Sequence, residues 1–254
     1  MMPNADTAAV PTIVLDVVDS TNAQALRLAK AGERGPLWIV AKQQSRGRGR
    51  RGRAWISPVG NLYATLMLTD PAPARAAPQL AFVAALALHD AAVAGAPALA
   101  SRLALKWPND LLCGGRKIAG ILVEGEGAPV AVAIGIGVNC RAHPDATELP
   151  ATDFAAAGAE VDAATLFWHL AAAMQARLAL WNRGAGFAEV RAAWLSRALG
   201  LGQAIWVRLA EREATGCFET IDEAGRLVLR TATGEVEAVA AGDVFPFGQA
   251  GSTL

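Results

Sequence analysis

Residues 46–53 read Arg-Gly-Arg-Gly-Arg-Arg-Gly-Arg, a run of five arginines separated by glycines. The run lies between two apolar stretches, residues 37–41 and 62–68, which are typical of buried strands. Glycine lets a backbone approach a ligand closely, and arginine presents a rigid fork of donors to phosphate or carboxylate. A cationic loop between two strands therefore predicts an anion-binding site.

The composition argues that this charge is local. The chain has 254 residues, 23 acidic and 23 basic, with a formal net charge of zero, so a broadly basic nucleic-acid surface is not expected. A hydrophobic content of 53% is enough to bury one large domain, alone or with a small one. The first residues lack the pattern of a secretory signal, and no contiguous apolar run reaches the ~18 residues of a membrane span. We expect a soluble, cytoplasmic protein.

Cysteine and histidine give no sign of a metal centre. The three cysteines, Cys113, Cys140 and Cys217, are far apart and form no CxxC pair, so neither a zinc site nor a disulfide framework is predicted. The three histidines, His89, His143 and His169, are isolated from any metal-ligand pattern or candidate nucleophile. Four scattered tryptophans are predicted to lie in the core: Trp168, Trp181, Trp194 and Trp206.

Hydrophobic periodicity predicts strands mixed with helices over the first 200 residues. The predicted strands cover residues 12–18, 37–44, 61–68, 102–107, 118–124 and 130–138, with a hairpin over 111–118 that turns at Gly114-Gly115. The predicted helices cover residues 23–31, 80–94, 165–181 and 187–199. Residues 141–160 read as an irregular connection.

From Gln203 the pattern changes to short alternating segments. These cover residues 205–209, 214–221, 227–230 and 236–240, with a turn at 222–225. Four or five short strands in about fifty residues predict a small β-barrel. We therefore expect a catalytic or binding domain over residues 1–200 and a second domain over 201–254.

Four further stretches accompany the arginine loop. They are Asp19-Ser20-Thr21-Asn22, KWPNDLL at 106–112, GRKIAGILVE at 115–124 and GIGVN at 135–139. With GRGRRGRAW at 47–55, their order and wording resemble the biotin–protein ligases, which activate biotin with ATP and attach it to a lysine of a carrier protein. The resemblance runs from about Val14 to Asn139. It implies an α+β fold with a mixed central sheet flanked by helices, like class II synthetases and biotin–lipoate ligases, plus a C-terminal SH3-like β-barrel.

The resemblance also implies roles for individual residues. The implied catalytic residues are Arg50, Lys117 and Asp110. The implied biotin site contains Ser20, Thr21, Asn22, Gln44, Arg48, Gly49, Arg50, Lys117 and Gly120. The implied ATP or adenylate site contains Arg50, Arg53, Trp55, Lys106, Asn109, Lys117 and Asn139. Asp110 is expected to brace Arg50, and Lys106 either steers phosphate or ends a strand.

The chemistry needs such residues. Joining a carboxylate to an amine in water is unfavourable, so the acid must first become a mixed anhydride, with pyrophosphate as the leaving group. Attack of one anion on another needs positive charge, which the arginine loop and Lys117 can supply. The acyl-adenylate hydrolyses easily, so a loop must exclude water around it. ATP and biotin are the expected substrates, with Mg²⁺ held chiefly by the ATP phosphates and no protein metal site.

Several alternatives stay open. A lipoate or octanoate ligase or transferase shares the fold, although the polar residues 20–22 suit a ureido ring better than an alkyl chain. The arginine loop could instead bind nucleic acid, and the protein could be an inactive binding module. Taken singly, residues 20–22 could be a helix cap, 106–110 a strand end and 115–117 a hairpin tip.

The expected partner is the carrier domain of a biotin-dependent carboxylase, with no nucleic acid or membrane, and the protein is expected to be a monomer or a homodimer. Only Met1–Ile13 precede the pattern, too few for the DNA-binding domain of some relatives, so no repressor function is expected. Arg46 stands where the family more often has a small residue, and its effect is not predicted.

Overall fold

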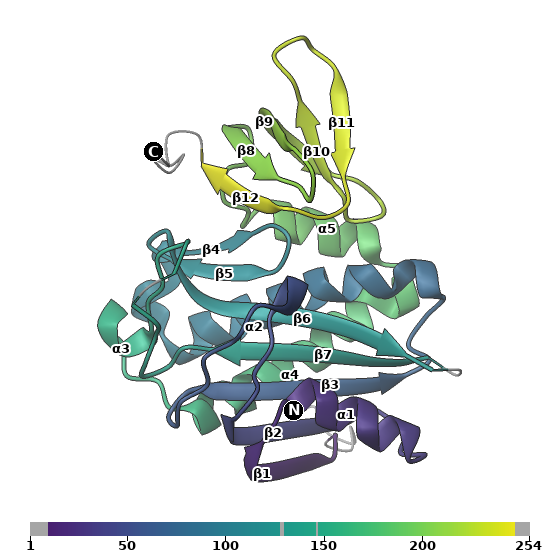
Figure 1. Cartoon of the computed structure of the whole chain (residues 1–254), viewed down its shortest axis with the longest axis vertical. Helices are drawn as coiled ribbons and strands as arrows, with labels where there is room; N and C mark the ends of the chain where they lie inside the picture. The colour runs from purple at the N-terminus through teal and green to yellow at the C-terminus, as the bar shows by residue number, and fades with distance from the viewer. Residues whose placement is uncertain (1–9, 128–129, 146, 247–254) are drawn as a thin grey trace, which may run out of the picture.

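A mixed sheet forms the centre of the molecule (Figure 1). The computed structural model describes residues 10–127, 130–145 and 147–246. The strands of this sheet are β1 (Thr12–Val18), β2 (Leu37–Gln44), β3 (Leu62–Thr69), β4 (Leu103–Lys106), β5 (Asp110–Cys113), β6 (Arg116–Glu126) and β7 (Ala131–Val138). They lie in the order β1-β2-β3-β7-β6-β5-β4, with β1 and β2 parallel and the other neighbours antiparallel. The predicted α+β class is confirmed.

Helices cover both faces of this sheet. The longer ones are α1 (Thr21–Lys30), α2 (Leu80–Gly95), α4 (Ala163–Trp181) and α5 (Phe187–Leu195). The short ones are η1 (Arg50–Gly52), η2 (Ala74–Gln79), η3 (Pro97–Arg102), α3 (Phe154–Ala157) and η4 (Asn182–Gly184). Residues of α2, α4 and α5 share one core with the sheet, whereas Ala25 of α1 packs in a separate, smaller cluster with Leu37, Ile39, Met67 and Ala133.

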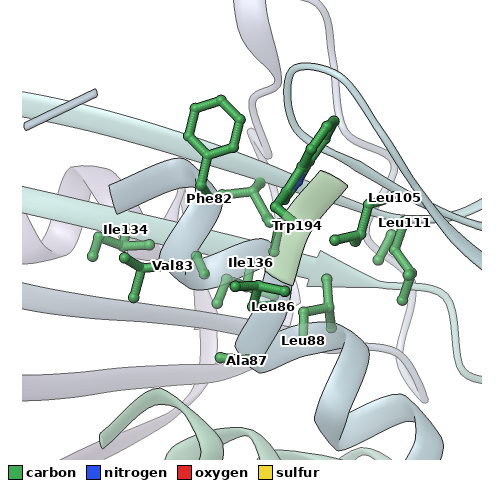
Figure 2. Packing of buried hydrophobic residues seen from close by; sticks show 14 of the residues in the cluster. Phe82, Val83, Leu86, Ala87, Leu88, Leu105, Leu111, Ile134, Ile136 and Trp194 are labelled. Atoms are coloured by element: carbon green, nitrogen blue, oxygen red, sulfur yellow. The ribbon is translucent and has the colours of Figure 1, made fainter. Parts of the chain in front are cut away.

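Helix α2 is largely apolar, and most of its residues are buried. Figure 2 shows its Phe82, Val83 and Leu86 packed with Ile136 of β7 and Trp194 of α5. With η2 it makes a 22-residue helical stretch, long and apolar enough by composition to cross a membrane, although no such segment was expected. Because 72% of its most apolar window is buried inside the protein, the apolar character is that of a core helix.

The C-terminal strands form a second, antiparallel sheet. They are β8 (Ala204–Arg208), β9 (Glu213–Ile221), β10 (Leu227–Arg230), β11 (Val236–Val239) and β12 (Asp243–Pro246), in the order β11-β10-β9-β8-β12. This sheet lies beside α5 and the β4–β5 hairpin (Figure 1), and Trp107 Nε1 donates to the carbonyl of Gly225 at 3.1 Å. Strand β12 follows the last strand that the sequence predicted.

Most predicted elements are confirmed within a few residues, and two differ. One turn of helix, α3, lies inside the predicted irregular connection, where Asp153 caps it by accepting from Ala156 N. Helix α5 ends at Leu195 and not at residue 199, because Leu105 of β4 pairs with the backbone of Arg197 and Leu199.

The core prediction is confirmed for two of the four tryptophans. Trp181 and Trp194 are buried, whereas Trp206 is half-buried and stacks on Phe245 at 4.2 Å between ring centroids. Trp168 is 69% exposed, because it lies on the outer face of α4 while Leu166 and Leu170 point inward.

Truncating the core on α2 should destabilise the protein strongly. Leu86 is fully buried, so Leu86→Ala is expected to lower the free energy of unfolding by about 2–5 kcal/mol. Val14→Ala on β1, where the side chain is 65% exposed, should change it by about 0.5 kcal/mol or less. Urea unfolding followed by circular dichroism measures both, and equal losses would contradict this account of the core.

Candidate functional site

A cavity of about 430 Å³ lies against β6 and β7 of the central sheet. Its walls are the start of α1, the arginine loop, the β4–β5 turn, part of the 141–151 connection and β12 of the C-terminal sheet. This volume is in the range of small-molecule sites.

The structure brings all the predicted site residues to this one cavity. Those lining it are Ser20, Thr21, Asn22, Gln44, Arg48, Gly49, Arg50, Arg53, Trp55, Lys106, Asn109, Asp110, Lys117, Gly120 and Asn139. They come from segments up to 119 residues apart, between Ser20 and Asn139. Their individual roles remain predictions.

Glycines leave the floor of the cavity open. A Cβ on Gly137 of β7 would lie 2.5 Å from Nε1 of Trp55, and one on Gly135 would lie 2.2 Å from Oδ1 of Asn22. These positions therefore need glycine so that the two side chains can lie against the sheet. Lys117 Nζ lies 5.4 Å from the centroid of the Trp55 ring, a cation–π contact at the middle of the site.

The end of the cavity nearest α1 is a hydrogen-bond network. Gln44 Oε1 accepts from the backbone N and the hydroxyl of Thr21, at 2.9 and 3.1 Å. Asn22 Oδ1 accepts from the Thr65 hydroxyl at 2.7 Å, and its Nδ2 donates to Glu124 Oε2 at 2.8 Å. These bonds fix the polar side chains before any ligand binds. Thr65 and Glu124 are members that the sequence analysis missed.

Ser20 has the structural role that was its alternative interpretation. Its hydroxyl accepts from Ala23 N and caps α1, and the same residue lines the cavity. Arg48 NH2 lies 3.1 Å from Glu124, so one carboxylate fixes both the arginine loop and Asn22.

A buried ion cluster lies under the other end of the cavity. Asp110 contacts Lys106 Nζ at 3.2 Å and Lys117 Nζ at 2.6 Å, and the Asp110 and Lys106 side chains are each only 8% exposed. Burial alone would raise the pKa of Asp110, but the two lysines outweigh it and hold the pKa below its usual range. Lys106 is therefore an ion-pair partner and not simply the end of β4.

Arg50 lines the cavity, but its partner is not the predicted one. Its NH1 donates to Asn109 Oδ1 and to the carbonyl of Gly242, each at 3.3 Å, while Asp110 pairs with the lysines. The expected brace from Asp110 to Arg50 is thus replaced by these two contacts. Burial lowers the pKa of Arg50, and the charges of Asp243 and Asp110 oppose that shift.

The C-terminal sheet supplies a wall that the sequence analysis did not foresee. Asp243 and Phe245 of β12 line the cavity, and Asp243 pairs with Arg53 at 2.5 Å. This hydrogen bond raises the pKa of Arg53. Burial alone would raise the pKa of Asp243, but Arg53, Arg51 and Arg50 together lower it. No motif marks Asp243, which lies 190 residues after its partner.

The histidines and cysteines lie away from the cavity lining. His143 Nδ1 is 2.6 Å from Asp153, and all three cysteines are free thiols. Among the described residues, no group of three or more His, Cys, Asp or Glu side chains could hold a metal ion.

Comparisons with known proteins agree on one family. The model of the biotin/lipoate A/B protein ligase family matches residues 14–139, and that of the biotin protein ligase C-terminal domain matches residues 200–245. The biotin–[acetyl-CoA-carboxylase] ligase of Paracoccus denitrificans is 46% identical over 89% of this chain and 97% of its own. The bifunctional ligase/repressor BirA of Bacillus subtilis is 34% identical over 86% of this chain and 69% of its own.

Solved structures of biotin protein ligases are also similar to this chain. The biotin protein ligase of Aquifex aeolicus in complex with biotin and ATP has a TM-score of 0.78, with 27% identity over 92% of this chain and 97% of that chain. The Leishmania major biotin protein ligase in complex with biotinyl-5-AMP has a TM-score of 0.65, with 27% identity over 91% of this chain and 99% of that chain.

Removing the buried carboxylate should destabilise the fold in a pH-dependent way. Asp110→Asn leaves two lysines without their counter-charge and should cost about 3–5 kcal/mol at pH 7. Because the folded pKa of Asp110 is lowered, its contribution is present above its unfolded pKa of about 4 and is lost as the pH falls through the folded value.

The stability difference between the Asp110→Asn variant and the unmodified protein should therefore be constant from about pH 5 to 8 and shrink below about pH 4. Urea unfolding at a series of pH values measures it. Asp16→Asn, at an exposed pair with Lys42, is the control and should have far less effect at every pH. A difference that grows toward acid pH would refute the assigned direction.

Proposed function

This chain belongs to the biotin/lipoate A/B protein ligase family, and on that premise we propose how its cavity performs the reaction of a biotin–protein ligase. The enzyme activates biotin with ATP as biotinyl-5'-AMP and transfers the biotinyl group to a lysine of a biotin carboxyl carrier protein. The observation that carries the mechanism is the convergence of a polar pocket, a glycine floor and a cationic cluster in one cavity.

Biotin lies with its ureido ring at the α1 end and its carboxylate toward Lys117. The Thr21, Asn22 and Gln44 network supports this orientation, since it offers fixed donors and acceptors to a polar ring. Gly120 and Gly137 let the side chains of Trp55 and Lys117 lie against the floor, beside the path proposed for the biotin chain. ATP takes the other end, near Arg53, Asn109 and Asn139.

The first step joins biotin to the α-phosphate. A carboxylate oxygen of biotin attacks the α-phosphorus, and the bond from this phosphorus to the bridging oxygen breaks as pyrophosphate leaves. Lys117 and Arg50 offset the negative charge of both reactants at the reacting atoms. Asp110 acts as a positioning residue, because it fixes the ammonium of Lys117 at 2.6 Å without contacting substrate itself.

The second step transfers the acyl group. The amine of the carrier lysine attacks the biotinyl carbonyl, the bond to the AMP oxygen breaks, and the lysine nitrogen loses a proton. Between the steps the anhydride must be kept from water. Trp55 lies below it on the cavity floor and the arginine loop forms one wall, so both are placed to shield it from water.

We extend the proposal to the setting of the reaction. The partner is the carrier domain of a carboxylase, and Mg²⁺ comes with ATP and is held by its phosphates. The free thiols favour the cytoplasm, a reducing compartment. The arginines at 48, 50, 51 and 53 contact groups of the protein itself, which argues against a nucleic-acid partner.

Two further points of organisation are proposals. We divide the chain into a catalytic domain over residues 1–200 and an SH3-like domain over 201–254, supported by the separate five-stranded sheet. The oligomeric state is monomer or homodimer. Strand β1 is an edge strand that exposes Val14 and Val17, so pairing with a second copy is open to it, and analytical ultracentrifugation decides between the two states.

Substrate choice tests the function. ATP–pyrophosphate exchange should depend on biotin and be absent with octanoate or lipoate, because the α1 end is lined by polar groups and not by a continuous apolar wall. Exchange driven by octanoate alone would replace the biotin assignment with the lipoate branch of the family.

Loss of Lys117 should slow activation itself. Lys117→Ala removes one electrostatic stabiliser and is expected to cut biotin-dependent exchange by about 100-fold or more. The control is Lys42→Ala, whose side chain pairs with Asp16 on the surface of β1 and β2 and should leave the rate unchanged. Single-turnover formation of biotinyl-AMP separates this step from transfer, and a nearly unchanged rate in the Lys117 variant would refute its role.

Loss of Arg50 should instead release the intermediate. Arg50→Gly removes the contacts to Asn109 and Gly242 that hold the loop, so biotinyl-AMP should form but escape about tenfold faster or more. The matched control is Arg46→Gly, in the same loop but outside the cavity lining. Gel filtration of enzyme with labelled biotinyl-AMP measures retention, and equal retention in both variants would contradict this assignment.

A further inference from the structure

Three arginines of the loop contact one place on the C-terminal sheet. Arg50 donates to the carbonyl of Gly242, while Arg51 and Arg53 both pair with the carboxylate of Asp243. Asp243 is the first residue of β12 and Gly242 directly precedes it, whereas the arginines lie in and beside η1. The loop is thus tied to the C-terminal sheet, in addition to the contact of Arg48 with Glu124 of β6.

The pairing at Asp243 is stronger than an ordinary surface ion pair. Its side chain is only 14% exposed, and Arg53 reaches both oxygens, at 2.5 and 3.4 Å. Exposed ion pairs contribute little because water screens them, but a bidentate pair with a shielded carboxylate is among the stronger charge-assisted contacts. This carboxylate therefore orders the arginine side chains.

The backbone of the loop needs such a tie. Arg51 has φ 55° and ψ 32°, the left-handed region that is unfavourable for a residue with a side chain. Its guanidinium is 3.3 Å from Asp243. The contacts with Asp243 therefore help to hold this conformation, together with the backbone bond from Gly49 N to the carbonyl of Arg53 and the pair of Arg48 with Glu124.

A second contact fixes β8 and β12 beside the cavity. Arg208 of β8 pairs with Glu148 of the connection that lines the other side of the site, and its guanidinium lies 5.0 Å from the ring centroid of Phe245. The C-terminal sheet therefore touches the cavity walls on two sides.

We propose that Asp243 is a positioning residue: its carboxylate serves as a built-in counter-anion that folds the arginine loop over the cavity before nucleotide binds. The effect on nucleotide rests on the proposed function, whereas the effect on loop order does not. Without Asp243 the loop samples open conformations, and ATP binding must then order it. The apparent affinity for ATP is then the intrinsic affinity multiplied by the fraction of molecules that are already closed.

The test compares Asp243→Asn with the unmodified full-length protein. An arginine-specific protease, with cleavage sites mapped by mass spectrometry, should cut within residues 46–53 about tenfold faster in the variant when no ligand is present. The KM for ATP in biotin-dependent exchange should rise about tenfold, with kcat within about twofold. Asp243→Glu, which keeps the charge, should restore much of both properties.

The matched control is Glu219→Gln, which removes the partner of Arg230 within the C-terminal sheet and should leave both readouts unchanged. Unchanged cleavage in Asp243→Asn would overturn the proposal, and so would faster cleavage with an unchanged KM or a loss confined to kcat. Absence of biotin-dependent exchange in the unmodified protein would count against the proposed function, while the cleavage result still decides loop order.

Circular dichroism checks that the Asn variant is folded. If it is not, the unmodified protein in about 0.5 M NaCl gives the same test, because salt weakens a partly exposed ion pair. Loop cleavage that does not become faster at high salt would then overturn the proposal.

Discussion

The placement of Lys117 depends on one buried carboxylate. Asp110 lies between Lys106 at the end of β4 and Lys117 on β6, so it joins both sides of the small hairpin that carries the cationic end of the site. A buried charge is costly unless it is paired, and this one is paired twice. Because the cluster keeps one more positive than negative charge, it still attracts an anion. The same interaction therefore stabilises the fold and prepares the reaction.

Close packing against glycines of the central sheet positions the other side chains of the site. Gly120, Gly135 and Gly137 leave a groove in the sheet into which Trp55 and Asn22 fit, and any side chain there would close it. The arginine loop lies beside this groove, and its Arg50 and Arg53 side chains contact Gly242 and Asp243 at the C-terminal sheet. A reactive anhydride formed over the floor would therefore have protein on several sides, which is what its protection from water requires.

The sequence analysis predicted the fold well where local rules decide it. Alternating apolar strands, the cap at Ser20 and the Gly114-Gly115 turn lie as expected, because propensity and turn chemistry agree there with tertiary packing. The convergence of the motifs in one cavity was predicted from their joint resemblance to a family. No single motif carried enough information for that.

What the sequence could not give are contacts between distant segments. Asp243 reaches Arg53 only because the C-terminal sheet docks on α5 and the β4–β5 hairpin, and nothing near residue 243 marks that docking. The partner of Asp110 was predicted to be Arg50, but the structure pairs it with two lysines. The register of strands β4, β5 and β6 brings the side chains of Lys106 and Lys117 next to Asp110. Trp168 was predicted to be buried because tryptophan is usually a core residue. Its side chain is exposed because it lies on the outer face of α4.

The central claim is that a single cavity both forms the acyl-adenylate and retains it. Native mass spectrometry of the purified protein after incubation with biotin, ATP and Mg²⁺ tests this most directly. We expect the protein to gain the mass of one biotinyl-AMP, and to lose that ligand when a carrier domain is added and becomes biotinylated. A protein that binds biotin and ATP separately, without forming or holding the adenylate, would contradict it.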